Sequence, residues 1–340
     1  AERSLQKAAA PSKLQEREAL IAPSSGIRMY PRGGSVCGAL LRNADTDMYW
    51  AKEAGRNGFA FDAEEMTAQA VQRVLLESKL RKALELDELL LHYQPQLDME
   101  SGKLIGAEAL LRWQQPEMGL IPPDRFIPLA EENGLILPIG EWVLHTACRQ
   151  AKKWLEQGLA FGRISVNIAT PQIQRGDLVR LVGQVLRETG LPSHCLELEV
   201  TESVIMEDFD QAIAVLEGLR ALGVRLAMDD FGTGYSSLAN LKRLPIEQLK
   251  IDQSFVRDIP DDSDDMAITR AVIALGISLQ LEVIAEGVET EQQRQFLLQE
   301  GCRLGQGYLF QRPVAPELFE QWAGTIQPAI GPATTGIPEG

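Results

Sequence analysis

Eight short apolar stretches, separated by amphipathic ones, place the strongest constraint on how this chain can fold. The candidate strands are Leu91–Leu97, Leu104–Leu111, Arg163–Ile168, Cys195–Val200, Val224–Asp229, Gln248–Asp252, Gln280–Glu286 and a short one near Cys302–Leu304. Helical spacing of apolar residues recurs between most of them, in Glu141–Gln157, Gly176–Thr189, Phe209–Leu222, Met266–Leu279 and Glu291–Glu300. This alternation predicts an α/β fold, a TIM-type (β/α)8 barrel. The short Asp98–Lys103 link predicts that the first strand runs antiparallel to the second.

Within these strands, apolar and polar residues alternate with a period of two. In Leu196–Val200 the apolar side chains share one face and two glutamates share the other. In a barrel the apolar face packs under the helices, so the polar face points inward and polar groups are expected to gather at the carboxyl ends of the strands. The residues expected to converge there are Glu108, Asn167, Glu199, Asp229, Asp230, Lys250 and Glu286.

The acidic groups of this set indicate a metal site. Oxygen donors without His or Cys favour hard ions such as Mg²⁺ or Mn²⁺. One ion does not need so many ligands, so two divalent cations are predicted, an arrangement suited to phosphodiester hydrolysis. A set of unrelated salt bridges around the rim is the alternative. Taken alone, Asp229-Asp230 before Phe231-Gly232 is also compatible with a surface turn.

Bulk properties exclude several classes of protein. A net charge of -15 argues against a nucleic-acid polymer as partner, because such surfaces are basic. The cysteines and histidines show no zinc spacing, which favours reduced thiols and a reducing compartment. No apolar run is long enough to span a membrane and no signal peptide opens the chain, so no membrane contact is expected. We expect a cytoplasmic protein, or the cytoplasmic part of a larger signalling protein.

The first 66 residues differ from the rest of the chain. Prolines and glycines precede a predicted helix from Asn43 to Ala54, which ends at the Gly55–Gly58 stop. A second predicted helix, Ala63–Leu86, connects to the main domain. The expected organisation is a partial α/β segment at 1–66, a linker helix at 67–85, the main domain at 86–325 and a flexible tail at 326–340.

Between about Leu86 and Trp322, an ordered series of motifs resembles the EAL family of cyclic di-GMP phosphodiesterases. The matching motifs are Tyr93-Gln94-Pro95, Glu108-Ala109-Leu110-Leu111-Arg112-Trp113, Ser165-Val166-Asn167, Glu199-Val200-Thr201-Glu202-Ser203, Asp229-Asp230-Phe231-Gly232-Thr233-Gly234, Lys250-Ile251-Asp252, Glu286-Gly287-Val288-Glu289 and Gln306-Gly307-Tyr308.

The resemblance implies roles for these residues. One metal would be held by Glu108, Asn167, Glu199 and Asp229. Asp229 would bridge to a second metal bound also by Asp230 and Glu286. Water between the metals would attack phosphorus to give linear pGpG. Lys250 would orient or activate that water, a role for which Glu286 competes as general base, and the residues alone do not decide between them.

The resemblance also implies a substrate and a partner. Gln94, Arg112 and Gln306 match positions that contact cyclic di-GMP, and Asp252, next to the lysine, is grouped with them. Glu202 matches the residue that holds the loop after the fourth predicted strand. This loop resembles the family's dimer-linked loop, so a homodimer is expected.

Residues 1–66 carry a second resemblance, to the C-terminal third of a GGDEF diguanylate cyclase domain. The matching pieces include Ser25-Gly26-Ile27, Leu40–Asp45 and Gly55-Arg56-Asn57. The cyclase signature is absent, so this piece is not expected to act as a cyclase.

Two alternatives to an active phosphodiesterase stay open. One is a catalytically silent receptor that binds cyclic di-GMP and signals to a partner. The other is a scaffold whose barrel mainly dimerises. The presence of every matched ligand favours the enzyme.

Overall fold

The computed structural model describes residues 12–14, 17–19, 24–27, 37–53, 58–61, 63–232 and 238–326. The chain forms two compact units, residues 1–79 and 80–340. Parts of three expectations lie outside the described residues: the helix stop at 54–57, the motif residues 233–235, and the tail at 327–340.

The first unit contains a small α/β arrangement. Strand β3 (Ser24–Ile27) pairs in parallel with β4 (Gly58–Phe61), and helix α2 (Cys37–Glu53) connects and contacts both. A two-stranded antiparallel hairpin, β1 (Ser12–Leu14) and β2 (Arg17–Ala19), precedes them. The helix predicted from Asn43 to Ala54 is present as α2 but begins earlier, at Cys37. The predicted connecting helix is α3 (Ala63–Ala83).

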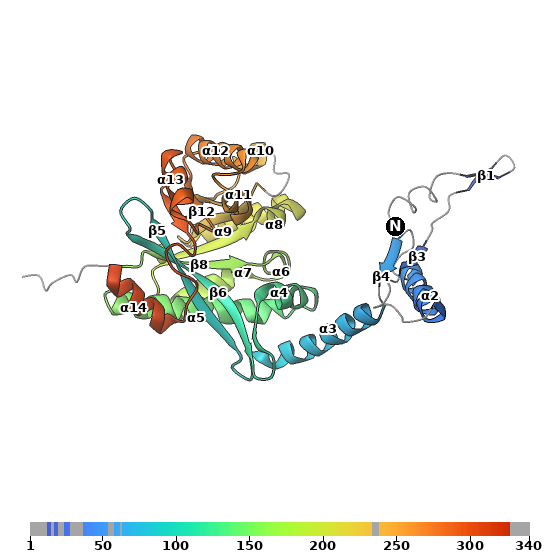
Figure 1. Ribbon diagram of the computed structural model, residues 1–340. Helices are drawn as coiled ribbons and strands as arrows, with labels where there is room; N and C mark the ends of the chain where they lie inside the picture. The colour runs from blue at the N-terminus through green and yellow to red at the C-terminus, as the bar shows by residue number, and fades with distance from the viewer. Residues whose placement is uncertain are drawn as a thin grey trace, which may run out of the picture. The chain divides into compact units, whose positions relative to one another are not determined.

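The second unit is a closed eight-stranded barrel (Figure 1). Its strands are β5 (Leu89–Asp98), β6 (Leu104–Gln115), β8 (Arg163–Ile168), β9 (Leu196–Thr201), β10 (Arg225–Phe231), β11 (Gln248–Ile251), β12 (Glu282–Ala285) and β13 (Leu304–Gln306). The order around the barrel is β5-β13-β12-β11-β10-β9-β8-β6, and β6 pairs back to β5. Strand β5 is antiparallel to both neighbours and the other pairs are parallel, which confirms the predicted barrel and its antiparallel first strand. A short strand that was not predicted, β7 (Gly119–Ile121), extends the end of β6.

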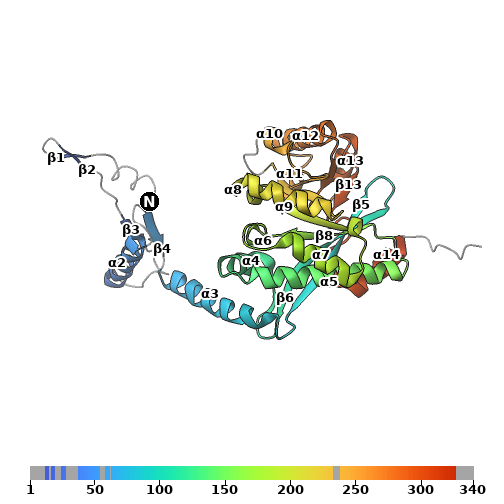
Figure 2. The ribbon, with the colours of Figure 1, turned by 180° about the vertical axis from the view of Figure 1, so that it is seen from behind.

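Helices cover the outside of the barrel. They are α4 (Pro123–Glu132), α5 (Ile136–Glu156), α6 (Thr170–Gln174), α7 (Leu178–Thr189), α8 (Glu202–Glu207), α9 (Phe209–Ala221), α10 (Leu238–Leu241), α11 (Gln253–Arg257), α12 (Ser263–Ser278), α13 (Glu291–Gln299) and α14 (Pro316–Ile326). Figure 2 shows α4, α5 and α7 along one side of the barrel, where α5 contacts both of the others. The outward side chains Leu196, Leu198 and Val200 are fully buried, as the period-two pattern requires.

The inward face is polar at both ends of the barrel, and the two ends form separate clusters. At the amino ends of the strands, Arg163 lies 2.9 Å from Glu282, and Arg225 lies 2.8 Å from Glu282 and 3.3 Å from Glu197. Four steps in the strand order separate β8 from β12, so the Arg163–Glu282 pair crosses the barrel. The expectation that inward polar groups gather at the carboxyl ends is therefore wrong for Glu197, Arg225 and Glu282, because each is paired at the opposite end.

Candidate active site

The site at the carboxyl ends of the strands is built around Lys250. This side chain points inward from β11 and is fully buried. Its Nζ lies 2.5 Å from Glu199, 2.6 Å from Glu286, 3.1 Å from Asp229 and 3.8 Å from Glu108. Parallel strands bring these acids together because inward residues at matching registers meet at the same end of a barrel.

Amide side chains from β5, β8 and β13 complete the wall of the site around Glu108 of β6. Asn167 Nδ2 donates to Glu108 Oε1 at 2.7 Å, and Gln306 Nε2 donates to Glu108 Oε2 at 2.5 Å. The same Gln306 nitrogen lies 3.0 Å from Gln94 Oε1. These bonds fix the Glu108 carboxylate from both sides, and they depend on the closure of the barrel between β13 and β5.

Position 307, next to Gln306, requires a glycine because two backbone segments approach each other closely there. A Cβ at Gly307 would lie 2.1 Å from the backbone oxygen of Val288, whose own N–H donates to the Gln306 carbonyl. The glycine therefore permits a close approach of two backbone segments, and this contact holds Gln306 at the site.

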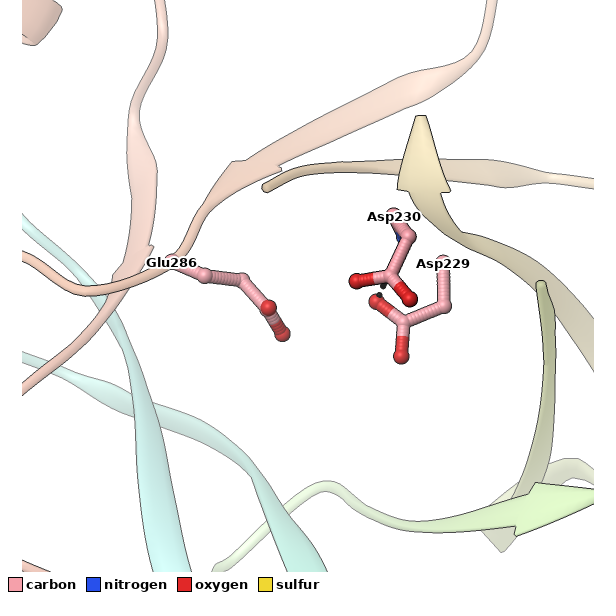
Figure 3. A group of neighbouring side chains, drawn as sticks. All are labelled: Asp229, Asp230 and Glu286. Atoms are coloured by element: carbon pink, nitrogen blue, oxygen red, sulfur yellow. Dashed lines mark hydrogen bonds between the residues drawn. The ribbon is translucent and has the colours of Figure 1, made fainter. Parts of the chain in front are cut away.

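Asp229, Asp230 and Glu286 form an acidic cluster on the other side (Figure 3). Each offers one carboxylate oxygen within 4.8 Å of the others. Asp229 and Asp230 lie near the carboxyl end of β10, just before Phe231, whereas Glu286 follows β12 and points toward them. Asp230 has a φ of 53°, and its N–H donates to Asp229 Oδ1 at 3.0 Å. This left-handed turn brings consecutive aspartates into one cluster, where an extended strand would send them to opposite faces.

Burial and mutual repulsion shift the pKa values in this cluster. Burial and the neighbouring Asp229 raise the pKa of Asp230 to about 6. Burial raises the pKa of Glu286 to about 8, with Lys250 acting against the rise. Burial likewise raises the pKa of Glu199 well above its usual range. Burial lowers the pKa of Lys250, but the surrounding carboxylates outweigh it and hold that pKa well above the usual lysine value.

These residues fit hard divalent cations. The donors are oxygens without His or Cys, which is the set that Mg²⁺ and Mn²⁺ prefer. Glu199 Oε1 is buried and has no hydrogen-bond partner among the described residues, so it is free to accept a cation. One lysine among four acids leaves a net negative charge in a buried site, and metal ions would offset it.

Two neighbouring cavities lie at this end of the barrel. One, of 240 Å³, is lined by polar and acidic side chains that include Gln94, Glu108, Asp229, Glu286 and Gln306. The other, of 420 Å³, is more apolar and lies between β6, α4, α5 and the end of β8. Leu110 and Asn167 line both, so the two cavities are neighbours.

The remaining predicted residues lie around this centre. Arg112 lines the apolar cavity, and its Nη1 donates to the Leu111 carbonyl at 2.8 Å. Asp252 lies beside Asp230 and accepts the Ser254 N–H at 3.0 Å, which caps α11. Glu202 is buried at the first turn of α8, immediately after β9.

The sequence indicated Tyr308, an aromatic residue at the rim of the site, only as part of the motif Gln306-Gly307-Tyr308. Tyr308 lines the acidic cavity and is about half exposed. The Arg312 guanidinium lies 4.1 Å from its ring centre, within the range of a cation–π contact. The only sequence signal for this pair is their spacing of four residues after the last strand.

Comparison with known proteins identifies the barrel. The sequence pattern of the EAL domain matches residues 77–313. The chain belongs to the EAL family. A solved structure of PaMucR phosphodiesterase in complex with c-di-GMP superposes with a TM-score of 0.70 at 50% identity, and the match covers 72% of this chain and 99% of that one. The EAL fold of the barrel is thus shown by an experimental relative.

Curated relatives extend the similarity beyond the barrel. The bifunctional diguanylate cyclase/cyclic di-GMP phosphodiesterase MucR of Pseudomonas aeruginosa is 48% identical over 318 residues, which is 93% of this chain and 46% of that protein. The cyclic di-GMP phosphodiesterase NbdA of the same organism is 45% identical over 321 residues, 94% of this chain and 41% of that protein. The chain spans less than half the length of these relatives. Among the described helices, none has both the length and the apolar character needed to cross a bilayer.

Proposed function

We propose that this chain hydrolyses cyclic di-GMP to linear 5′-pGpG with two divalent cations, Mg²⁺ or Mn²⁺. The observation that carries the proposal is the complete set of oxygen donors around one buried lysine, next to an acidic and an apolar cavity. The names of curated relatives, which include cyclic di-GMP phosphodiesterases, support the substrate.

The donors divide into two groups. Glu108, Asn167, Glu199 and Asp229 would hold one cation, and Asp229, Asp230 and Glu286 would hold the other. When bound, the cations supply charge that lowers the pKa of water and offsets the charge of the phosphodiester. Every ligand is on or next to a barrel strand, so the donor set is largely preformed.

Lys250 and Glu286 take different parts in this proposal. Because surrounding carboxylates hold the Lys250 ammonium in its charged form, it orients Glu199, Asp229 and the attacking water and does not remove a proton. Glu286 is the group we assign to accept the proton of that water, because its carboxylate lies beside the Lys250 ammonium and faces Asp229 and Asp230 in the cluster.

The two cavities suit the two kinds of group in the substrate. The acidic cavity, once its charge is offset by cations, would receive the phosphate, with Gln94 and Gln306 at its wall. The apolar cavity of 420 Å³ has the size and character of a site for a flat guanine base, with Arg112 at its edge. Asp252 would support Asp230 from the α11 cap and would not touch the substrate.

We also propose an oligomeric state, a cellular location and an origin for residues 1–66. We infer a homodimer in which the segment begun by Glu202 is linked to the partner, and a cytoplasmic location. Residues 1–66 are interpreted as the last part of a GGDEF domain without its signature. The match of 93% of this chain to a relative named as a diguanylate cyclase/phosphodiesterase supports that interpretation.

Product analysis with purified chain and Mg²⁺ or Mn²⁺ tests the proposal. We expect cyclic di-GMP to be converted to pGpG, and Glu108→Ala to reduce the rate by at least about 100-fold, because it removes a ligand and two hydrogen bonds. Glu317→Ala, which changes an exposed acid on α14, serves as control. Tight binding with intact cyclic di-GMP would instead favour the silent receptor, and indifference to Glu108→Ala would favour the scaffold.

A further inference from the structure

A second polar cavity lies at the opposite end of the barrel, at the amino ends of β6, β8 and β10. It has a volume of 600 Å³, and we call it the amino-end pocket. Leu104, Arg163 and Arg225, the first residues of these three strands, line the pocket. Residues of the turns before β8 and β10 also line it. The active-site donors lie at the other ends of the same strands, so the pocket is no part of the site described above.

Basic side chains outnumber acidic ones in the lining of the amino-end pocket. The chain carries a net charge of -15, yet the described lining contains five basic side chains, Lys103, Arg163, His194, Arg220 and Arg225, and a single acid, Glu247. Glu247 Oε2 lies 3.8 Å from Arg225 Nε, and Arg225 is also paired with Glu197 and Glu282. The positive charge that these acids do not compensate therefore comes from Lys103 and Arg220. An acidic protein that gathers basic groups around a cavity creates a local site for an anion.

The basic groups fall into a fixed pair and an open set. Arg163 and Arg225 are held by Glu197 and Glu282 in the ion-pair cluster of the barrel interior. Arg163 is buried, and its Nε–H has no hydrogen-bond partner in the described part of the chain. The fixed guanidinium groups are therefore already oriented, and a ligand would not have to order them.

Lys103, His194 and Arg220 form the open set. All three are exposed, and none has an ion-pair partner within the described residues. These three side chains come from different segments of the chain and line one cavity. On an ordinary protein surface, basic side chains are interspersed with acidic ones.

We propose that the amino-end pocket binds the phosphate group of a phosphorylated small molecule about the size of a nucleoside monophosphate. Arginine forks match the oxygens of phosphate in pairs, as they do those of carboxylate, which favours an oxyanion over a halide. A phosphate carries more negative charge than a carboxylate, so several cations around one cavity favour phosphate. The volume of 600 Å³ exceeds that of a lone phosphate and lies in the range of sites for small organic ligands. This binding is independent of the hydrolysis proposed above.

Calorimetric titration of the full chain with 5′-GMP and with inorganic pyrophosphate tests the proposal. The titrations are made in EDTA, so that no divalent cation draws the phosphate to the acidic cluster. We expect saturable binding with one site, and we expect Arg220→Glu to weaken it by about tenfold or more, because an exposed cation becomes an anion at the pocket. Arg220→Lys should retain most of the affinity.

Arg149→Glu is the matched control. Arg149 is an exposed arginine on α5 outside the pocket lining, and its reversal changes the net charge by the same amount. Affinity within about twofold of wild type is expected for this variant. The proposal is overturned if neither probe binds at millimolar concentration, if both reversals weaken binding equally, or if Glu108→Ala abolishes binding while Arg220→Glu leaves it unchanged.

Discussion

Lys250 is a fully buried cation whose ammonium group lies within 4 Å of four carboxylates. In a buried site one positive charge cannot neutralise four negative ones, so some of the acids hold protons when no metal is bound. The raised pKa values of Asp230, Glu199 and Glu286 express this imbalance. Metal binding at this site would therefore be coupled to the release of protons from these acids.

We predict that the stabilisation of the folded protein by Mn²⁺ increases with pH. Asp230 and Glu286 have raised pKa values, about 6 and about 8, so the metal-free folded protein binds more protons than the unfolded chain in this range. Its free energy of unfolding therefore loses a contribution from these groups as the pH rises through these values. Mn²⁺ requires the deprotonated carboxylates, so it competes better with protons at higher pH.

Denaturant unfolding with and without Mn²⁺, between about pH 5 and about pH 8, measures this difference. Asp230→Asn should flatten the part of the dependence near the pKa of Asp230, since the amide does not titrate. A stabilisation by Mn²⁺ that is the same at all pH values would contradict the assignment of these acids as ligands.

How far the site could be predicted from the sequence depended on where each residue lies. Inward residues of regular strands, such as Glu108 and Glu199, follow from the period of two. The bond between Gln306 and Gln94 could not be foreseen without knowing that β13 pairs with β5, because 212 residues separate the two amides. Asp252 was grouped with the substrate contacts, but in the structure it caps α11 and adjoins Asp230, a local role common for aspartate.

Among the elements, α14 is fixed to the barrel by one acid and a stack of aromatic rings. Glu320 accepts hydrogen bonds from Trp154, Lys153 and Gln150 of α5, at 3.0, 3.1 and 3.2 Å. Phe319 stacks on Trp154 with 4.6 Å between ring centres. These contacts join the last helix to α5, although more than 160 residues lie between them in the sequence.

Glu320→Ala should lower the free energy of unfolding by about 1–3 kcal/mol, because Trp154 Nε1 loses its partner in a largely buried position. Gln321→Ala, on the exposed side of the same helix, should change it by less than about 0.5 kcal/mol. Urea unfolding of both variants measures the difference. Equal effects would mean that Glu320 does not fix α14.

The eight barrel strands and the helices α5, α7, α9, α12 and α13 were predicted within a few residues, whereas β7 and the helices α4 and α14 were not predicted. Residues with a clear period, as in β8 and α9, carry their own signal over the whole element. Strand β7 has three residues and no period, and it exists because Gly119–Ile121 pairs with the end of β6. The cluster of Arg163 and Glu282 was missed for a related reason: the strands are far apart in sequence, and only the closed barrel brings them together.

Across the whole molecule, the two ends of the barrel carry different tasks. The carboxyl end gathers acids that are incompletely neutralised, whereas the amino end pairs its buried acids with arginines. Barrels commonly separate function at one end from stability at the other. Changes at the amino end should therefore alter stability more than metal binding.

Glu197→Gln tests this separation. Glu197 is fully buried, accepts a hydrogen bond from Ser165 and pairs with Arg163 and Arg225, so the variant leaves the buried Arg163 and the partly buried Arg225 short of a counter-charge. We expect a loss of about 3–5 kcal/mol in the free energy of unfolding and an unchanged Mn²⁺ affinity below the unfolding transition. Unfolding curves and Mn²⁺ titration give the two quantities. A large loss of Mn²⁺ affinity would show that the two ends are coupled.

Anomalous diffraction from crystals soaked with Mn²⁺ and cyclic di-GMP tests whether Asp229 bridges two metal ions. We expect two Mn²⁺ peaks, both coordinated by Asp229. One should also contact Glu108, Asn167 and Glu199, and the other should contact Asp230 and Glu286. A single peak distant from Asp229, or two peaks that share no ligand, would contradict this expectation.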